Sequence, residues 1–209
     1  MPRVSFAKQR EHLMIQDPIL ATLIAQVKLK PFKKAERDHF RTLVQSIVAQ
    51  QLSDKAATTI INRLIALFPR KIFPAPQDLL RTDTEKLRSV GLSYAKASYI
   101  KDLAERVVTK QIHLPSFEAM SDEEVTRELV AVKGIGPWTA EMFLIFSLHR
   151  EDIFSYGDLG LQNAIWRLYK LKTRPTKKQM ERIVQKWRPY RSLAARYLWA
   201  GLDSALFKM

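Results

Sequence analysis

The sequence contains no cysteine, and its few histidines are scattered along the chain at positions 12, 39, 113 and 149. Without thiols there can be no disulfides, no thiolate zinc sites and no cysteine-ligated iron–sulfur clusters. Histidines this far apart also argue against a histidine metal site. Any chemistry must therefore come from carboxylates, amides and aromatic rings.

Long apolar runs are absent as well. The longest are short pieces such as Met142 to Phe146, whereas a bilayer-spanning helix needs roughly 20 apolar residues. The N-terminal stretch from Met1 to Leu13 has charges but no hydrophobic segment of the kind found in secretory signals. With 209 residues, 46% of them hydrophobic, the chain can bury a substantial core. We therefore expect a soluble protein without membrane partners, cytoplasmic or, in a eukaryote, nuclear.

Acidic residues are scarce relative to basic ones: 21 Asp and Glu stand against 35 Lys and Arg, a formal net charge of +14. Between Asn163 and Trp199 there are eleven basic residues and one acid, Glu181. Such an excess favours a polyanionic partner, because each phosphate that is neutralised releases condensed counterions. A merely solvated surface is the alternative. The concentration of charge in one segment makes nucleic acid the better prediction.

Helical periodicity recurs along most of the chain, and strand alternation is nearly missing. Residues 39–51 place apolar side chains on one face, and a second helix begins after a predicted N-cap at Ser53. Capping-box patterns at Thr82 to Glu85 and at Ser121 to Glu124 predict two more helix starts. The sequence thus predicts an all-α fold of about ten helices in one compact unit over residues 1–209. Two lobes with a groove between them are compatible with the same pattern.

The segment KGIGPWTAEMF, from Lys133 to Phe143, stands between two apolar helical patterns. Glycines at Gly134 and Gly136 allow a sharp turn and a close approach of backbone amides to a ligand. The amides at the start of the next helix favour an anion such as a phosphate, to which Lys133 and Thr139 can add a charge and a hydroxyl. A plain interhelical turn is the alternative. The whole arrangement, at about residues 121–148, resembles the helix-hairpin-helix element that grips the DNA backbone without reading sequence.

Asp158 follows this hairpin in SYGDLGLQN, before another predicted helix. An N-cap role is the ordinary explanation. The combination of Gly134, Gly136, Pro137 and Asp158 nevertheless resembles the helix-hairpin-helix, Gly/Pro-rich, Asp (HhH-GPD) superfamily of DNA glycosylases. Four blocks extend the resemblance to the 3-methyladenine DNA glycosylase II family over most of the chain from about Phe40: residues 45–57, 90–100, 132–148 and 187–199. Some members carry an extra N-terminal sheet domain, for which this length leaves no room, so the compact, two-lobed form is expected.

The resemblance implies a repair enzyme that flips an alkylated purine, such as 3-methyladenine or 7-methylguanine, out of duplex DNA and hydrolyses its N-glycosidic bond. Asp158 would be the catalytic carboxylate, stabilising positive charge on the sugar and aligning water. Relatives that also cut the strand carry a lysine where this chain has Trp138, so a glycosylase without lyase activity is implied. Trp138, Tyr156 and Trp199 are the candidates for the base pocket, with core packing as the alternative for each.

The segment from Gln50 to Ser53 matches the place of the residue that fills the gap left by the flipped base, with Gln51 as first candidate and Leu52 as second. A buried helix-end amide is the alternative for both glutamines. The resulting set of candidate DNA contacts comprises Gln50, Gln51, Leu52, Ser53, Lys133, Gly134, Ile135, Gly136, Thr139, Arg191 and Ser192.

Two other functions stay open at this point: a non-catalytic helix-hairpin-helix clamp, and a glycosylase for deaminated or oxidised bases. The resemblance implies no cofactor and a monomer that binds double-stranded DNA containing alkylated bases. No side-chain metal site is expected. In relatives the hairpin carbonyls can hold a monovalent cation, a property that side-chain patterns do not report.

Overall fold

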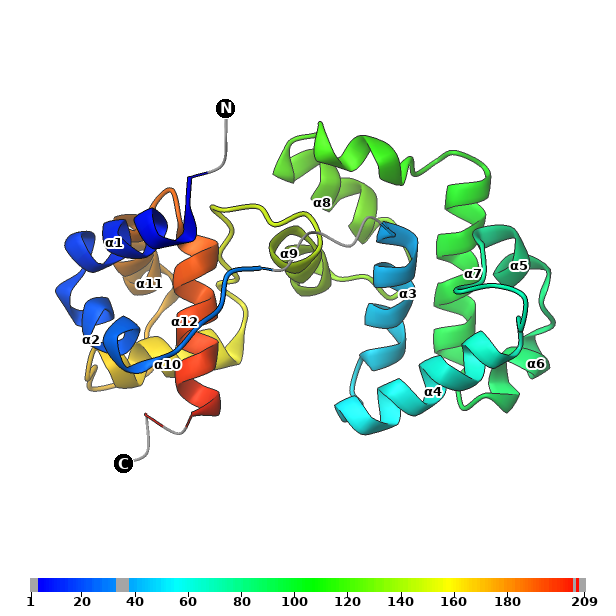
Figure 1. Cartoon of the computed structure of the whole chain (residues 1–209), viewed down its shortest axis with the longest axis horizontal. Helices are drawn as coiled ribbons and strands as arrows, with labels where there is room; N and C mark the ends of the chain where they lie inside the picture. The colour runs from blue at the N-terminus through cyan, green and yellow to red at the C-terminus, as the bar shows by residue number, and fades with distance from the viewer. Residues whose placement is uncertain (1–3, 33–37, 205, 207–209) are drawn as a thin grey trace. The chain divides into compact units, whose positions relative to one another are not determined.

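The computed structural model describes residues 4–32, 38–204 and 206. These residues form helices and connecting turns without a strand among them, which confirms the predicted all-α class (Figure 1). None of the described helices is long and apolar enough to cross a bilayer. The chain divides into two compact units, a discontinuous unit of residues 1–35 and 149–209 and a central unit of residues 36–148. The expectation of a single compact protein with a groove stays a prediction.

The described residues of the central unit form seven α-helices and one short 3-10 helix. They are α3 (His39–Ala49), α4 (Asp54–Ala66), α5 (Pro76–Arg81), α6 (Thr84–Ser89), α7 (Tyr94–Val108), η1 (Leu114–Glu118), α8 (Asp122–Val130) and α9 (Pro137–Phe146). The long helix α7 packs against α3, α5 and α6, and α8 packs against α9. As a result α7 forms the spine of this unit.

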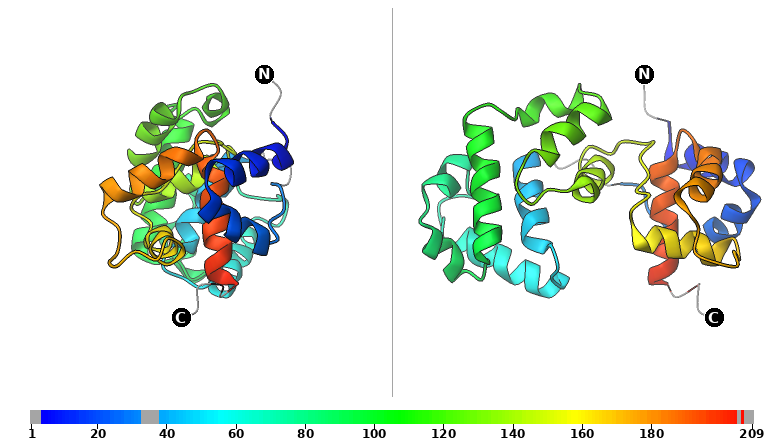
Figure 2. Two further views of the ribbon diagram at one scale, coloured as in Figure 1. Left: turned by 90° about the vertical axis from the view of Figure 1, so that its left-hand side faces the viewer. Right: turned by 180° about the vertical axis from the view of Figure 1, so that it is seen from behind.

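The discontinuous unit combines the two ends of the chain. Its helices are α1 (Phe6–Gln16), α2 (Pro18–Gln26), α10 (Leu159–Leu168), α11 (Lys177–Val184), η2 (Gln185–Trp187) and α12 (Arg191–Asp203). Figure 2 shows α12 running beside α2 and α10, with which it packs. The twelve α-helices described exceed the ten or so expected, partly because α5 and α6 have only six residues each.

The two helices predicted on either side of residues 50–53 are observed as α3 and α4, which pack against each other. The apolar face of α3 lies in the core, with Leu43, Val44, Ile47 and Val48 fully inaccessible to solvent. The Ser53 hydroxyl accepts the Ala56 amide and caps α4 as expected. Along α4 the burial is less complete than the pattern suggested, because Ile60, Ile61 and Leu67 are only half-buried.

One of the two predicted capping boxes is confirmed and the other is wrong. Ser121 and Glu124 cap each other's backbone amides at the start of α8. At the second place α6 begins at Thr84, and the cap is Asp83, whose carboxylate accepts the amides of Glu85 and Lys86. Thr82 instead ends α5 and donates its hydroxyl to the Asp78 carbonyl. The pattern failed because a stronger capping residue stands inside it.

A buried carboxylate, Asp17, organises the discontinuous unit. Its side chain caps α2 by accepting the amides of Ile19 and Leu20. The other carboxylate oxygen accepts the indole N–H of Trp187 at 3.0 Å and the hydroxyl of Tyr169. Burial and this bond to Asp17 raise the pKa of Tyr169, which therefore stays a donor. One side chain thus joins α2 to the segments that follow α10 and α11.

Replacing Asp17 with alanine should lower the free energy of unfolding by about 3 kcal/mol, because a cap and two buried donors lose their acceptor together. The matched control is Asp83→Ala, which removes an exposed cap and should cost about 1 kcal/mol. Chemical denaturation of the three proteins measures both differences. Equal losses for the two variants would show that the buried network adds nothing to capping.

Candidate functional site

The turn between α3 and α4 carries the predicted gap-filling residues. Gln51 adopts a left-handed backbone conformation with φ of 57°, and its side chain and that of Leu52 are exposed. The Gln50 amide donates to the Gly134 carbonyl at 2.8 Å, so the side chain ties this turn to the hairpin. A left-handed non-glycine residue costs about 1 kcal/mol or more, and it is retained only where its surroundings fix it. An exposed side chain at the tip of a constrained turn is the geometry expected of a wedge, the residue that fills the gap left by a flipped base.

The hairpin between α8 and α9 turns at Gly134, whose φ is +78°. A Cβ at this position would lie 2.1 Å from the Tyr99 ring, so the ring occupies the space that the missing side chain leaves. Val132 and Ile135 are buried beneath the turn. Glycine is therefore required here by the fold itself, whatever the hairpin binds.

Gly136 differs from Gly134 in both conformation and surroundings. Its φ of −92° and ψ of 174° are ordinary extended values, and it stands as the N-cap of α9 without a capping side chain. No described atom lies within 4 Å of the Cβ that another residue would have there. Neither conformation nor packing explains this glycine, and the surface beside it is open to a ligand at the start of a helix.

Two other hairpin residues are engaged within the protein, one by burial and one by an ion pair. Thr139 is buried in the first turn of α9, with 7% of its surface exposed. The Lys133 side chain is two-thirds exposed, and its ammonium lies 3.7 Å from the Asp102 carboxylate. Burial raises the pKa of Asp102, but hydrogen bonds from the Lys133 amide and from Arg106 outweigh this effect and hold that pKa below its usual value. Contact of Lys133 or Thr139 with phosphate stays a prediction.

Asp158 caps α10 in the discontinuous unit and is largely buried. Its Oδ1 accepts the Leu161 amide at 2.7 Å and the indole N–H of Trp199, on α12, at 3.2 Å. A Cβ at Gly160 would lie 3.0 Å from this oxygen. The N-cap explanation is therefore confirmed, and the carboxylate is also held by the Trp199 indole. Its catalytic role stays a prediction.

The three candidate pocket aromatics have different surroundings. Trp199 is half-buried and bonded to Asp158. The Tyr156 ring stands edge-on to the Phe154 ring, with 5.1 Å between their centroids. The Lys177 ammonium lies 6.0 Å from the centroid of the Tyr156 ring. Trp138, in the first turn of α9, has half of its surface exposed. Asp158, Tyr156 and Trp199 belong to the discontinuous unit and Trp138 to the central unit, so the pocket they would form together stays a prediction.

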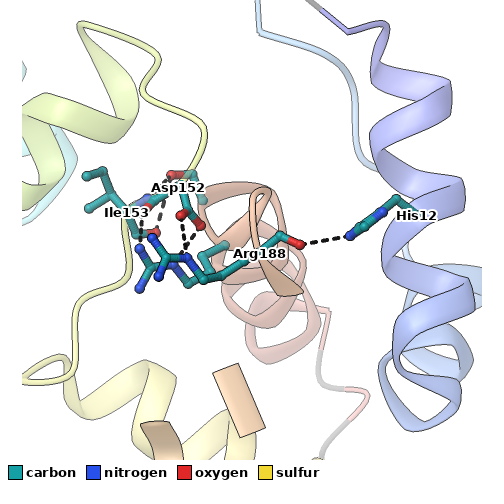
Figure 3. A network of polar contacts seen from close by, with 6 residues as sticks. His12, Asp152, Ile153 and Arg188 are labelled. Carbon is teal, nitrogen blue, oxygen red and sulfur yellow. Dashed lines mark hydrogen bonds and ion pairs between the residues drawn. The ribbon is translucent and has the colours of Figure 1, made fainter. Parts of the chain in front are cut away.

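Arg191 and Ser192, expected at phosphate, hold in place the loop that contains Asp152 and Ile153, the two loop residues labelled in Figure 3. The guanidinium of Arg191 donates to the carboxylate and to the carbonyl of Asp152, both at 2.6 Å. The Ser192 hydroxyl accepts the Ile153 amide and donates to its carbonyl. Arg188 adds a second ion pair to Asp152 at 2.9 Å. Their contact with DNA stays a prediction, whereas this clamp on the loop before Tyr156 is what the structure shows.

Sequence reasoning missed Asp152, Lys96 and Asp102, whose side chains form hydrogen bonds or ion pairs with the candidate segments. Asp152 receives two arginines, and Lys96 donates to two carbonyls at the α3–α4 turn. No local pattern marks such residues, because their partners lie far away in sequence.

A family model describing HhH-GPD superfamily base excision DNA repair proteins matches residues 44–189. Among curated proteins, DNA-3-methyladenine glycosylase 1 of Schizosaccharomyces pombe is 34% identical over 93% of this chain and 87% of its own length. The putative DNA-3-methyladenine glycosylase YfjP of Bacillus subtilis is 32% identical over 78% of this chain, which spans 59% of that relative.

Solved structures give the same result. The S. pombe 3-methyladenine DNA glycosylase Mag1, in complex with abasic DNA, superposes with a TM-score of 0.82 and 33% identity, covering 94% of this chain and 97% of that one. A DNA-3-methyladenine glycosidase from Bacillus halodurans gives a TM-score of 0.83 and 35% identity, with 96% and 91% covered.

The two hairpin glycines should respond differently to alanine. Gly134→Ala should lower the free energy of unfolding by about 2 kcal/mol or more, because a left-handed alanine is strained and its methyl group would meet Tyr99. Gly136→Ala should change it by no more than about 0.5 kcal/mol. Thermal and denaturant unfolding of the pair provide the measurement. A large loss for Gly136→Ala would mean that its glycine serves the fold after all.

Proposed function

Because this chain belongs to the HhH-GPD superfamily of base excision DNA repair proteins, we propose that it hydrolyses the N-glycosidic bond of alkylated purines in duplex DNA and leaves an abasic site. The observation that carries this proposal is the Asp158 carboxylate, fixed by the Leu161 amide and by the Trp199 indole. A carboxylate held at one position can act on a sugar that is brought to it, whereas a mere clamp needs no such group.

The chemistry follows from the leaving group. Breaking the bond from C1′ of the sugar to the purine nitrogen leaves positive charge on the sugar, which a nearby carboxylate stabilises. Alkylation at N3 or N7 makes the purine cationic, so it departs as a neutral base without a proton from a general acid. Asp158 then aligns the water that attacks C1′ and accepts its proton. One carboxylate is sufficient for both steps.

DNA binding is supported by the hairpin and by the charge of the chain. Gly136 leaves the start of α9 uncovered, so that backbone amides can approach a phosphate without interference from a side chain. The formal net charge of +14 adds long-range attraction to the duplex. Contacts of this kind position the protein on the backbone without selecting a sequence.

The names of the relatives support the choice of substrate. S. pombe Mag1, of which this chain covers 97%, is named a 3-methyladenine DNA glycosylase and is bound to abasic DNA in its solved structure. We extend that activity to this chain and propose 3-methyladenine and 7-methylguanine as its substrates. We further propose that it acts as a monomer, in the cytoplasm or in the nucleus of a eukaryote. Selectivity would come from stacking of an electron-poor base on Trp138, Tyr156 or Trp199.

Asp158→Asn provides the sharpest test of the catalytic role. Asparagine is an equally good N-cap and keeps an oxygen for Leu161 and Trp199, so the fold should be retained while the charge is lost. Release of 3-methyladenine and 7-methylguanine from methylated DNA should slow on the order of a thousand-fold. Binding to a duplex with an abasic analogue should stay near wild type.

The matched control for this variant is Asp83→Asn, which makes the same change at the exposed cap of α6 and should release bases at the wild-type rate. Continued excision by Asp158→Asn would overturn the mechanism. A wild-type protein that binds DNA but releases no base from alkylated, deaminated or oxidised DNA would instead be a clamp.

The product should be an intact strand containing an abasic site, because Trp138 stands where a lyase has its lysine. Strand breaks should therefore appear only after alkali, and borohydride should trap no covalent complex between protein and DNA. Gel electrophoresis of the reaction with and without alkali gives the answer. Breaks formed without alkali would show that another amine of this basic chain acts as a nucleophile.

A further inference from the structure

The two turns predicted to contact DNA, one between α3 and α4 and one between α8 and α9, are both fastened to one helix, α7. Lys96, in the first turn of α7, donates its ammonium to the carbonyls of Val48 and Gln50 at 2.7 and 2.6 Å. These carbonyls stand at the C-terminal end of α3, where backbone acceptors have no partner within the helix and carry partial negative charge. Lys96 therefore ties the α3–α4 turn to α7.

The hairpin is fastened three and six residues further along the same helix. The Tyr99 ring fills the space beside Gly134. The Asp102 carboxylate accepts the Lys133 amide at 3.0 Å. Residues spaced by three lie next to one another on a helix surface, so Lys96, Tyr99 and Asp102 form one stripe. This stripe of α7 contacts the two turns together.

A direct link closes the arrangement. The Gln50 side chain donates to the Gly134 carbonyl at 2.8 Å, while its own carbonyl is held by Lys96. The next residue, Gln51, is the left-handed tip of the α3–α4 turn. Hydrogen bonds thus connect Lys96 to Gln50 and Gln50 to Gly134. The tip residue, Gln51, directly follows the middle residue of this linkage.

A lysine is a costly choice for this position if packing were its only purpose. Burial lowers the pKa of Lys96, which means that keeping a charged ammonium at this position is unfavourable in free energy. Donors on a long side chain can satisfy two carbonyls of an irregular turn at once, which an apolar residue cannot do. The residue fits a turn whose backbone has to be held in one shape.

We propose that Lys96 is a positioning residue, which sets the gap-filling tip at Gln51 against the hairpin so that the wedge and the phosphate grip engage one duplex in register. This inference rests on the proposed function, because it assumes that both turns meet DNA. Lys96 itself touches no substrate. Its loss should therefore impair capture of the distorted duplex and base release more than binding to ordinary DNA.

The test is Lys96→Met, which keeps the length of the side chain and removes its donors. Single-turnover release of 3-methyladenine should slow at least about ten-fold, since misplacing a positioning group by a fraction of an ångström has effects of this size. Affinity for an undamaged duplex should change less than about three-fold, because the backbone amides of the hairpin remain. The preference for a duplex with a tetrahydrofuran abasic analogue should be lost.

Gln50→Leu supplies a second variant, which breaks the link to Gly134 while the bonds of Lys96 remain. It should slow base release with little change in thermal stability. The double variant should be no slower than the slower single variant by more than about two-fold, because both act through one linkage. Independent effects that multiply would overturn the proposal.

Lys101→Met is the matched control. The Lys101 side chain lies on the same helix, beside Asp102 and Lys133, and donates no hydrogen bond to either turn among the described residues. Its replacement removes a lysine of α7 without releasing a turn, so the rate of base release and the preference for the abasic duplex should stay unchanged. A wild-type rate and an intact abasic preference in Lys96→Met would contradict the proposal even where the wild-type protein releases bases. A wild-type protein without any base release would contradict the proposed function instead, and the preference for the abasic duplex would still test the role of Lys96.

Discussion

The contact between the Tyr99 ring and the bare Cα of Gly134 is the constraint on which the central unit depends. It brings the hairpin against α7 more closely than any residue with a side chain would allow. Once the hairpin is seated there, Val132 and Ile135 are buried and α9 begins with its open end at Gly136. The Gln50 amide then finds the Gly134 carbonyl within reach. The absence of a Cβ at Gly134 therefore determines where the α3–α4 turn and the α8–α9 hairpin meet.

In the discontinuous unit one carboxylate oxygen accepts hydrogen bonds from two different helices. Asp158 Oδ1 ends the row of unpaired amides at the start of α10, and it also receives the Trp199 indole from α12. Capping holds the carboxylate in one rotamer, which is what chemistry at a fixed sugar carbon requires. The clamp formed by Arg191, Ser192 and Asp152 steadies the chain a few residues upstream. The bonds that cap α10 would therefore also position the carboxylate that we propose as catalytic.

Much of this was accessible from the sequence because it is encoded locally. The apolar face of α3, the caps at Ser53 and Ser121, and the turn at Gly134 follow from residues within one or two helical turns of each other. Asp158 was indicated instead by a family resemblance, through its combination with Gly134, Gly136 and Pro137. The reach of Lys96 to Val48, or of Arg191 to Asp152, crosses tens of residues and leaves no periodic trace. Local patterns also misled at Thr82, where Asp83 is the stronger cap.

Gly160 limits how the segment around Asp158, the proposed catalytic residue, can vary. The space where its side chain would stand is already enclosed by the Asp158 carboxylate, by Leu202 and by Trp199. A larger residue there would press first on the carboxylate oxygen, so the side chain at this position would change the orientation of Asp158. Gly160, which has no side chain to take part in the proposed chemistry, therefore determines how closely the start of α10 can pass the Asp158 carboxylate and Trp199.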